Sequence, residues 1–476
     1  MNANIRRLGI FFLIAFALIL ADVTYWQVID AASMQARADN PRLQLQAERV
    51  LRGRILDRNG TVLADRTVDA QGVVHRTYTD PSLSQVIGYD SQRFGKSELE
   101  RTYDDYLTGR SVGTSWQEQI NQWEHKQVAG DDLNLTIDDR LQQQVAAILP
   151  RNPSAAIVAD PRNGEILAMV SKPTFDSSQI DAPGYWQSLL ANADSPLINR
   201  PVNGYYTPGS TFKMLTMSAA IDSGIMSPST QFNGVDATGP LTVDSHVYPA
   251  AINNLPSGVG NVDLTHALMY SDNIVFAKVG LALGPDHFKD YVHRFGIDHP
   301  TPFDIPVSQS HLLAPRETFS GPDLASSAFG QGGLHVTPLQ MLMVGEAQAN
   351  GGAIPNPVLV KQVRSPSGSV VNSANYGTLY QPISSQTASQ VRDAMVQVVE
   401  AGSGFEAKIP GVQVAAKTGT AETGVGEAPH AWFVAFAPAD HPRVAVAVIV
   451  EHGGEGAFVA APLAKQILQA ALAVTH

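Results

Sequence analysis

Three short motifs, which occur in one order along the chain, constrain this sequence more than any other feature. They are Ser210-Thr211-Phe212-Lys213, Ser271-Asp272-Asn273 and Lys417-Thr418-Gly419. Each motif alone is short enough to occur by chance, and Ser373-Ala374-Asn375 repeats the Ser-x-Asn pattern in a polar stretch. The order of the motifs and the local structure predicted around each indicate one serine acyl-transfer site in which lysine moves the proton.

The first motif lies where a turn leads into a helix. Pro208-Gly209 signals a turn, and the apolar run from Phe212 to Ile221 predicts a helix that ends near Gly224. Ser210 and Lys213 therefore lie on one face of a helix N-terminus. Burial and the helix dipole favour the neutral amine of Lys213, which can take the serine proton. The alternative is a helix-capping serine and a surface lysine.

The second motif also lies at a predicted loop-to-helix junction, because Asn273 is followed by the apolar residues Ile274 to Ala277. In a functional site the Ser271 hydroxyl would pass a proton to the leaving amine. Asn273 would bind a substrate amide through its paired donor and acceptor, while Asp272 holds the turn. The alternative is a simple helix cap made by Ser271 or Asp272.

The third motif lies in a predicted antiparallel meander. The segments that read as its strands are 412–420, 431–436 and 444–450. A two-residue period places Lys417 and Gly419 on one face of the first strand and Thr418 and Thr420 on the other. The missing side chain at Gly419 allows a substrate to approach the backbone closely. The alternative is an ordinary edge strand whose lysine deters aggregation.

Periodicity and turn signals predict the remaining elements. A strand pair at 155–160 and 165–171 is expected to join the meander, and a C-terminal helix at 461–474 to pack on it. The front part of the chain is expected to hold a hairpin around Asn59-Gly60 and helices at 96–107 and 132–148. The polar, glycine-containing stretches 235–261 and 351–377 are expected to be surface loops beside the cleft.

An apolar segment near the N-terminus predicts a membrane anchor. Arg6-Arg7 precede an uncharged run from Leu8 to Ala21, and extension to Val28 gives about 30 Å of helix, enough to span a bilayer. Tyr25-Trp26 suit the membrane interface. The positive charge before the span predicts a cytoplasmic tail at 1–7, a span at 8–28 and the rest of the chain outside. The alternative is a cleaved signal peptide.

Composition excludes several classes of function. The chain contains no cysteine, so thiol catalysis, disulfides and thiolate metal sites are ruled out. The 13 histidines show no zinc-type spacing, and no metal or cofactor is expected. A net charge of −12 argues against binding to nucleic acid.

The chain resembles the class B penicillin-binding proteins, the membrane-anchored D,D-transpeptidases of the bacterial cell wall, over nearly its whole length. Besides the three motifs, the segments that carry the resemblance are 52–60, 135–138, 159–161, 164–168, 199–201, 329–332, 337–340 and 430–433. The short length is similar to that of the small actinobacterial members.

This resemblance implies an α/β fold of the α+β sandwich type. A transpeptidase domain at 151–476, with an antiparallel sheet flanked by helices, would follow a pedestal or dimerisation-like domain at 29–150. The expected catalytic residues are Ser210, Lys213, Ser271, Asn273 and Lys417. The expected substrate-binding residues are Asp272, Thr418, Gly419 and Thr420. Backbone N–H groups of Ser210 and Thr420 would stabilise the oxyanion.

The resemblance also implies partners. These are peptidoglycan stem peptides as D-Ala-D-Ala donor and amine acceptor, β-lactam antibiotics, the membrane, a multi-spanning glycan polymerase, and proteins of the division or elongation machinery.

Two other functions remain open at this point. The Ser-Asp-Asn form of the second motif is shared with β-lactamases, but those enzymes also need a glutamate that activates water. Glu317 and Glu346 lie between the second and third motifs without the usual Glu-x-x-Leu-Asn context. A D,D-carboxypeptidase or β-lactamase is therefore one alternative to a transpeptidase. A non-catalytic penicillin sensor or scaffold is the other.

Overall fold

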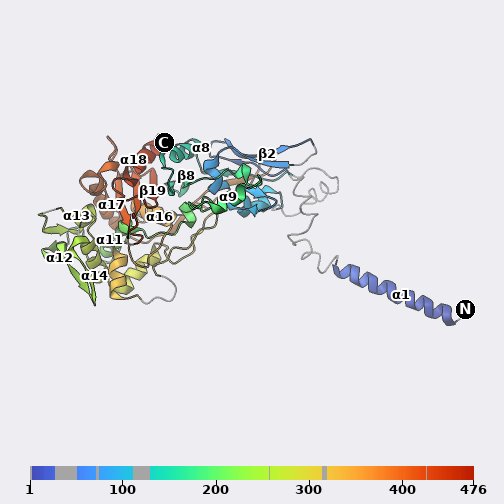
Figure 1. Cartoon of the computed structure of the whole chain (residues 1–476), viewed down its shortest axis with the longest axis horizontal. Coiled ribbons are helices and arrows are strands. Elements are labelled where there is room, and N and C mark those ends of the chain that lie inside the picture. The colour runs from blue at the N-terminus through green and yellow to red at the C-terminus, as the bar shows by residue number, and fades with distance from the viewer. Residues whose placement is uncertain are drawn as a thin grey trace.

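A five-stranded antiparallel sheet forms the centre of the molecule (Figure 1). The computed structural model describes residues 3–26, 51–70, 74–110, 129–252, 254–256, 258–313, 319–424 and 426–475. The strands lie in the order β17 (Ala415–Ala421), β18 (His430–Ala437), β19 (Val444–Val450), β7 (Ser154–Asp160) and β8 (Glu165–Lys172). The predicted meander and the strand pair that joins it are confirmed.

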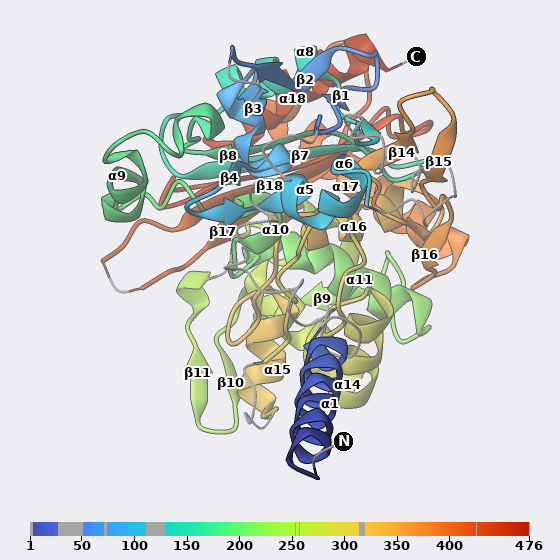
Figure 2. The same ribbon diagram turned by 90° about the vertical axis from the view of Figure 1, so that its right-hand side faces the viewer.

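Alternating side chains divide this sheet between two hydrophobic cores. Along β18, Trp432 and Val434 belong to one core, whereas Phe433 and Ala435 belong to the other. The helices of the first core include α11 (Lys213–Asp222), α14 (Asn273–Arg294), α16 (Pro338–Ala349) and α17 (Ser385–Glu400). Those of the second are α8 (Asp139–Ile148) and α18 (Ala460–Val474), so the predicted C-terminal helix is confirmed. Figure 2 shows α8 and α18 on one side of the sheet and α11 and α16 on the other.

The predicted helix at 132–148 is wrong in its first part. Residues Asp132–Leu135 form strand β6, and only Asp139–Ile148 is helical, as α8. Leu133, Leu135 and Ile137 alternate and are fully buried, which is the pattern of a strand with one buried face. Asp138 then caps the helix by accepting a hydrogen bond from Leu141 N at 3.1 Å.

A second, six-stranded sheet forms the pedestal. Its order is β15 (Val370–Ser373), β14 (Val360–Arg364), β6, β1 (Ile55–Leu56), β2 (Val62–Val68) and β3 (Val74–Tyr78). The predicted hairpin joins β1 and β2 and turns at Gly60, whose φ is +87°. The pedestal is therefore built from two distant parts of the chain, because β14 and β15 come from the second half.

The expectation of a surface loop at 351–377 is thus wrong for its central part. Val360 and Val363 of β14 are buried, and a register shift against β6 lies between Val360 and Gln362. This irregularity breaks the two-residue period by which a strand is recognised in a sequence. The stretch 235–261 likewise holds the short helix α12 (Val235–Thr238) and the hairpin strands β10 (Leu241–Val243) and β11 (His246–Tyr248).

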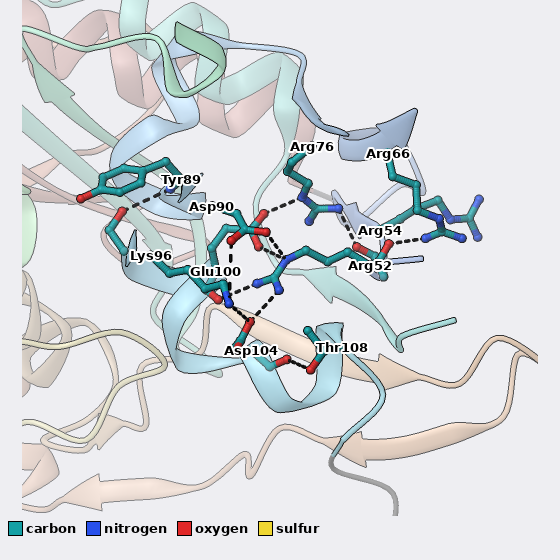
Figure 3. A network of polar contacts seen from close by, with 12 residues as sticks. Arg52, Arg54, Arg66, Arg76, Tyr89, Asp90, Lys96, Glu100, Asp104 and Thr108 are labelled. Carbon is teal, nitrogen blue, oxygen red and sulfur yellow. Dashed lines mark hydrogen bonds and ion pairs between the residues drawn. The ribbon is translucent and has the colours of Figure 1, made fainter. Parts of the chain in front are cut away.

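Buried ion pairs hold the pedestal together (Figure 3). Glu100 is fully buried and accepts from Arg52 Nε and from Arg76 Nε, each at 2.6 Å. Burial alone would raise the pKa of Glu100, but Arg52 and Arg76 shift the pKa below its usual value. Arg52 also donates to Asp104 Oδ1 at 2.6 Å. Arg52, the first residue of the segment 52–60, is therefore the centre of a charge network.

The predicted helix at 96–107 is present as two shorter helices. They are α5 (Glu98–Thr102) and α6 (Asp104–Leu107), and Tyr103 between them has non-helical φ and ψ of −104° and 20°. The Tyr103 hydroxyl donates to Asp304 Oδ1, and Asp304 Oδ2 accepts from Leu359 N and Val360 N at 2.8 and 2.9 Å. This carboxylate therefore joins the pedestal helices to the start of β14.

The N-terminal helix α1 (Ala3–Thr24) is a candidate membrane anchor. An 18-residue window within Asn4–Thr24 has a mean hydropathy of 2.1 and is not buried by the rest of the protein. The helix begins inside the predicted tail 1–7, and residues 27–28 of the predicted span lie outside the described part of the chain.

Candidate active site

Ser210 lies in a 3-10 turn, Gly209–Phe212, that leads directly into α11. The predicted turn-to-helix junction is therefore present. The aromatic ring of Phe212 is fully buried and anchors the turn to the core, while Ser210 stays partly exposed. The Ser210 Oγ lies 3.0 Å from the Lys213 Nζ.

Close backbone packing places this turn against the end of β17. Gly209 has a φ of +55°, and a Cβ atom there would lie 2.7 Å from Thr420 O. A Cβ at Gly419 would lie 2.8 Å from Thr211 Cγ2. Both contacts need the small volume of glycine. The backbones of Ser210 and Thr420, the predicted oxyanion donors, are consequently neighbours.

The amine of Lys213 is fully buried among oxygen atoms. Besides Ser210 Oγ, it contacts Asn273 Oδ1 at 2.6 Å, Ser271 O at 2.7 Å and Ser271 Oγ at 3.3 Å. Asn273 Nδ2 donates to Ile252 O at 3.2 Å, which orients the amide so that its oxygen meets the amine. Burial lowers the pKa of Lys213 to about 7, although nearby Asp272 acts in the opposite direction.

Ser271 occupies a strained position between α13 (Leu264–Tyr270) and α14. Its φ is +63°, which non-glycine residues rarely adopt. Asp272 holds the following turn because its Oδ1 accepts from Val275 N at 2.8 Å. Asp272, predicted among the substrate-binding residues, is fully buried, and its position favours this capping role.

Lys417 on β17 contacts Ser271, the serine that Lys213 also contacts. Its Nζ donates to Ser271 Oγ at 2.7 Å and to Thr418 O at 3.0 Å, and it lies 3.4 Å from Thr418 Oγ1. Burial lowers the pKa of Lys417, and a proton on Lys213 lowers it further. The three sequence motifs therefore meet in one hydrogen-bonded cluster.

The two threonines after Lys417 have different surroundings. Thr418 Oγ1 lies 2.8 Å from Ser403 Oγ, whereas Thr420 Oγ1 accepts from Gly456 N at 3.3 Å. Thr418 is 5% exposed, and Thr420 is more exposed.

Sequence reasoning missed three residues of this cluster: Ser403, Asn254 and Phe276. Asn254 Nδ2 donates to Ser271 O at 2.7 Å, and the Phe276 ring lies 5.5 Å from the Lys213 Nζ. Phe276 falls three residues after Asn273, a spacing that places it on the same helix face. Ser403 and Asn254 lie in loops, where no periodic signal exists.

Of the two glutamates considered for water activation, Glu346 lies among the described residues and does not suit that task. Glu346 is buried in α16, and burial together with Asp160 raises its pKa well above the usual value. A protonated carboxyl group cannot accept a proton from water. Glu317 lies outside the described residues.

The geometry defines a class of protein: a serine acyltransferase with a lysine beside the nucleophile and a second lysine on the adjacent strand. Residues 154–469 match the penicillin binding protein transpeptidase domain, and residues 52–133 match the penicillin binding protein A dimerisation domain. The chain belongs to the penicillin-binding protein transpeptidase family, as the resemblance predicted.

Named proteins are similar to this chain over nearly its whole length. Peptidoglycan D,D-transpeptidase PbpA of Mycolicibacterium smegmatis is 32% identical over 501 residues, which cover 99% of each chain. The protein of that name from Mycobacterium tuberculosis is 30% identical over 498 residues and 99% of each chain. The structure of penicillin-binding protein A from M. tuberculosis as a ceftriaxone acyl-enzyme complex has a TM-score of 0.82 and 31% identity. It covers 90% of this chain and 100% of that one.

Two glycines in one turn test how the nucleophile is positioned. Gly330 has a φ of +88°, and a Cβ there would lie 1.8 Å from Gly209 O. Gly332 has a φ of +77°, but its Cβ would meet no atom closer than 3.4 Å. We expect Gly330→Ala to slow acylation by penicillin roughly a hundredfold or more, because it displaces the Ser210 turn. Stopped-flow acylation measures the effect.

Gly332→Ala is the matched control, since it carries the same backbone strain without the collision. It should cost stability with a much smaller loss of acylation rate. Equal losses in the two variants would show that strain, not the contact with Gly209, accounts for the effect.

Proposed function

We propose that this protein is a peptidoglycan D,D-transpeptidase in which Ser210 attacks the penultimate D-Ala carbonyl of a stem pentapeptide. The observation that carries the assignment is the set of acceptors around Lys213 Nζ. A neutral amine has two N–H donors and one lone pair. The carbonyl oxygens of Ser271 and Asn273 take the two donors, which leaves the lone pair for the Ser210 proton.

The second lysine suits the charged form. Three oxygen atoms surround Lys417 Nζ, namely Ser271 Oγ, Thr418 O and Thr418 Oγ1. They match the three N–H donors of an ammonium group. Burial lowers the pKa of Lys417 well below its usual value, and the three acceptors around Lys417 Nζ oppose that effect by favouring its ammonium. Because each ammonium disfavours the other, a proton on Lys417 keeps Lys213 neutral. The charge on Lys417 supplies positive potential, and Ser271 relays a proton to the departing D-Ala.

Acylation then balances as follows. The Ser210 Oγ bonds to the carbonyl carbon while its proton passes to Lys213. The peptide C–N bond breaks, and D-Ala leaves as an amine that has received a proton through Ser271. Backbone N–H groups of Ser210 and Thr420 hold the oxyanion, and one such donor contributes about 3–4 kcal/mol.

Transfer completes the reaction. An amine of a neighbouring peptidoglycan strand attacks the ester carbonyl, and the carbon–Oγ bond breaks. The proton that this amine gives up returns through Lys213 to Ser210. Asn273 and the backbone at Gly419 bind the donor peptide, and Thr418 with Thr420 binds its terminal carboxylate. A β-lactam mimics D-Ala-D-Ala and leaves a long-lived ester on Ser210.

Intact-mass measurement after penicillin exposure tests the nucleophile. We expect one covalent adduct on the wild-type chain and none on Ser210→Ala, because Ser210 has the partly exposed hydroxyl that lies 3.0 Å from the Lys213 Nζ, whereas Ser271 is buried. Ser223→Ala, near the far end of α11, is the control and should keep the adduct. A full adduct on Ser210→Ala would overturn the assignment.

The lifetime of that adduct separates this function from its rivals. A transpeptidase should hold the penicilloyl group over many minutes, whereas a β-lactamase would release it quickly and consume the drug.

The pH dependence of acylation tests the role of Lys213. The neutral amine is the reactive form, so the rate should rise with pH through an apparent pKa of about 7 and then level off. Stopped-flow measurement between about pH 5 and pH 9 covers this window. Lys361→Met should keep the profile, because this lysine lies on β14 of the pedestal sheet with its side chain 44% exposed. A rate that rises only near the ordinary pKa of lysine would contradict a neutral Lys213 at neutral pH.

We also propose that α1 anchors the chain with its N-terminus in the cytoplasm and the catalytic domain outside. The support is Arg6-Arg7 before the apolar segment. In that location the pedestal is placed to dock a multi-spanning glycan polymerase and proteins of the division or elongation machinery.

A single cysteine tests location and partner together, since the chain has none of its own. Val68 is 49% exposed on β2 of the pedestal. In intact cells Val68→Cys should react with a maleimide that cannot cross the membrane. A crosslinker with one maleimide and one photoreactive group, which needs no thiol on the partner, should join it to a polymerase. Labelling only after the cells are broken would refute the orientation, and crosslinks to other proteins alone would refute the partner.

A further inference from the structure

A serine outside the three motifs lies against the third motif. Ser403 stands between α17 and β17, in the loop Gly402–Gly404, and is partly exposed. Its Oγ lies 2.8 Å from Thr418 Oγ1. No other partner of the Ser403 hydroxyl is seen among the described residues.

The loop that carries Ser403 is held rigidly. A Cβ at Gly402 would lie 2.5 Å from Met269 O, and Ser403 N donates to the same carbonyl at 3.2 Å. Gly404 N donates to Val398 O at 2.8 Å. Met269 lies two residues before Ser271, so the loop connects the second motif to the third.

The hydrogen atoms of the two hydroxyls can be assigned from what each must do. A hydroxyl has one donor and two acceptor lone pairs. If Thr418 binds a carboxylate, which only accepts, its single proton points to the substrate. The 2.8 Å contact with Ser403 then requires Ser403 to donate to Thr418. Donation to Thr418 Oγ1 also polarises its O–H and strengthens the bond to the anion.

We propose that Ser403 is a positioning residue, which orients the Thr418 hydroxyl toward the terminal carboxylate of the donor peptide and the equivalent carboxylate of β-lactams. This inference rests on the proposed function. Without Ser403, the Thr418 hydroxyl proton would be free to turn toward a backbone carbonyl and would lose its direction.

Benzylpenicillin and its methyl ester form a matched pair of probes, because they differ only in the carboxylate. The measured quantity is the ratio of their acylation rate constants, acid over ester, on the full chain. We expect Ser403→Ala to lower this ratio roughly tenfold, the size of one hydrogen bond to a charged group. Ser403→Thr, which keeps the hydroxyl, should restore it. Ser367→Ala, on the exposed β14–β15 hairpin, should leave it unchanged.

Three outcomes would overturn the proposal. In the first, acid and ester slow equally in Ser403→Ala, as they would if the loop were merely disturbed. In the second, Ser403→Thr fails to restore the ratio although the variant folds. In the third, Ser403→Ala lowers the ratio as much on a Thr418→Ala background as on the wild type, which would mean that Ser403 does not act through Thr418.

A failure of the proposed function would give a different result from these three outcomes. In that case the wild-type chain would form no stable penicilloyl adduct at all, and the ratio could not be measured.

Discussion

The site depends on the burial of two lysine amines that share one serine. Lys213 and Lys417 are both fully buried, and both contact Ser271 Oγ. Moving an ammonium out of water costs several kcal/mol even after the protein relaxes. That cost is offset only where acceptors are already in place. The strained turn at Ser271 and the amide of Asn273 provide those acceptors from one short segment.

The central sheet brings the segments of this cluster together. Strand β17 is an edge strand, so its backbone at Gly419 and Thr420 is free to meet the Ser210 turn. The alternation of β18 between two cores fixes the face of each side chain, because a slip of one residue would move Trp432 into the other core and turn Lys417 away from Ser271. The same edge gives a peptide substrate a strand to pair with.

The pedestal is physically continuous with the catalytic half. Strands β14 and β15 extend its sheet, and Asp304 joins Tyr103 of the pedestal to the start of β14. Buried ion pairs around Glu100 stabilise the pedestal side of this connection. The predicted boundary near residue 150 therefore does not separate two independently packed units, because strands from beyond it complete the pedestal sheet.

Local patterns in the sequence were sufficient to predict the elements in which apolar residues recur at the regular spacing of a strand or a helix. The apolar periods of β7, β8, β19 and α18, the turn before Ser210, and the anchor segment could all be predicted from neighbouring residues alone. The motifs also predicted which side chains meet. Where a bulge interrupts the period, as in β14, or a strand runs directly into a helix, as at 132–148, the same patterns misled.

Only the tertiary structure decided what surrounds each motif. Ser271 and Asn273, whose oxygens accept from Lys213 Nζ, lie 58 and 60 residues further along the chain, and Ser403 contacts Thr418 from a loop outside the three motifs. No period or spacing encodes such contacts, because a loop residue is placed by the elements that it packs against. The sequence by itself predicted a lysine-assisted serine site, and packing decided which acceptors surround each lysine and which serine hydroxyl contacts Thr418.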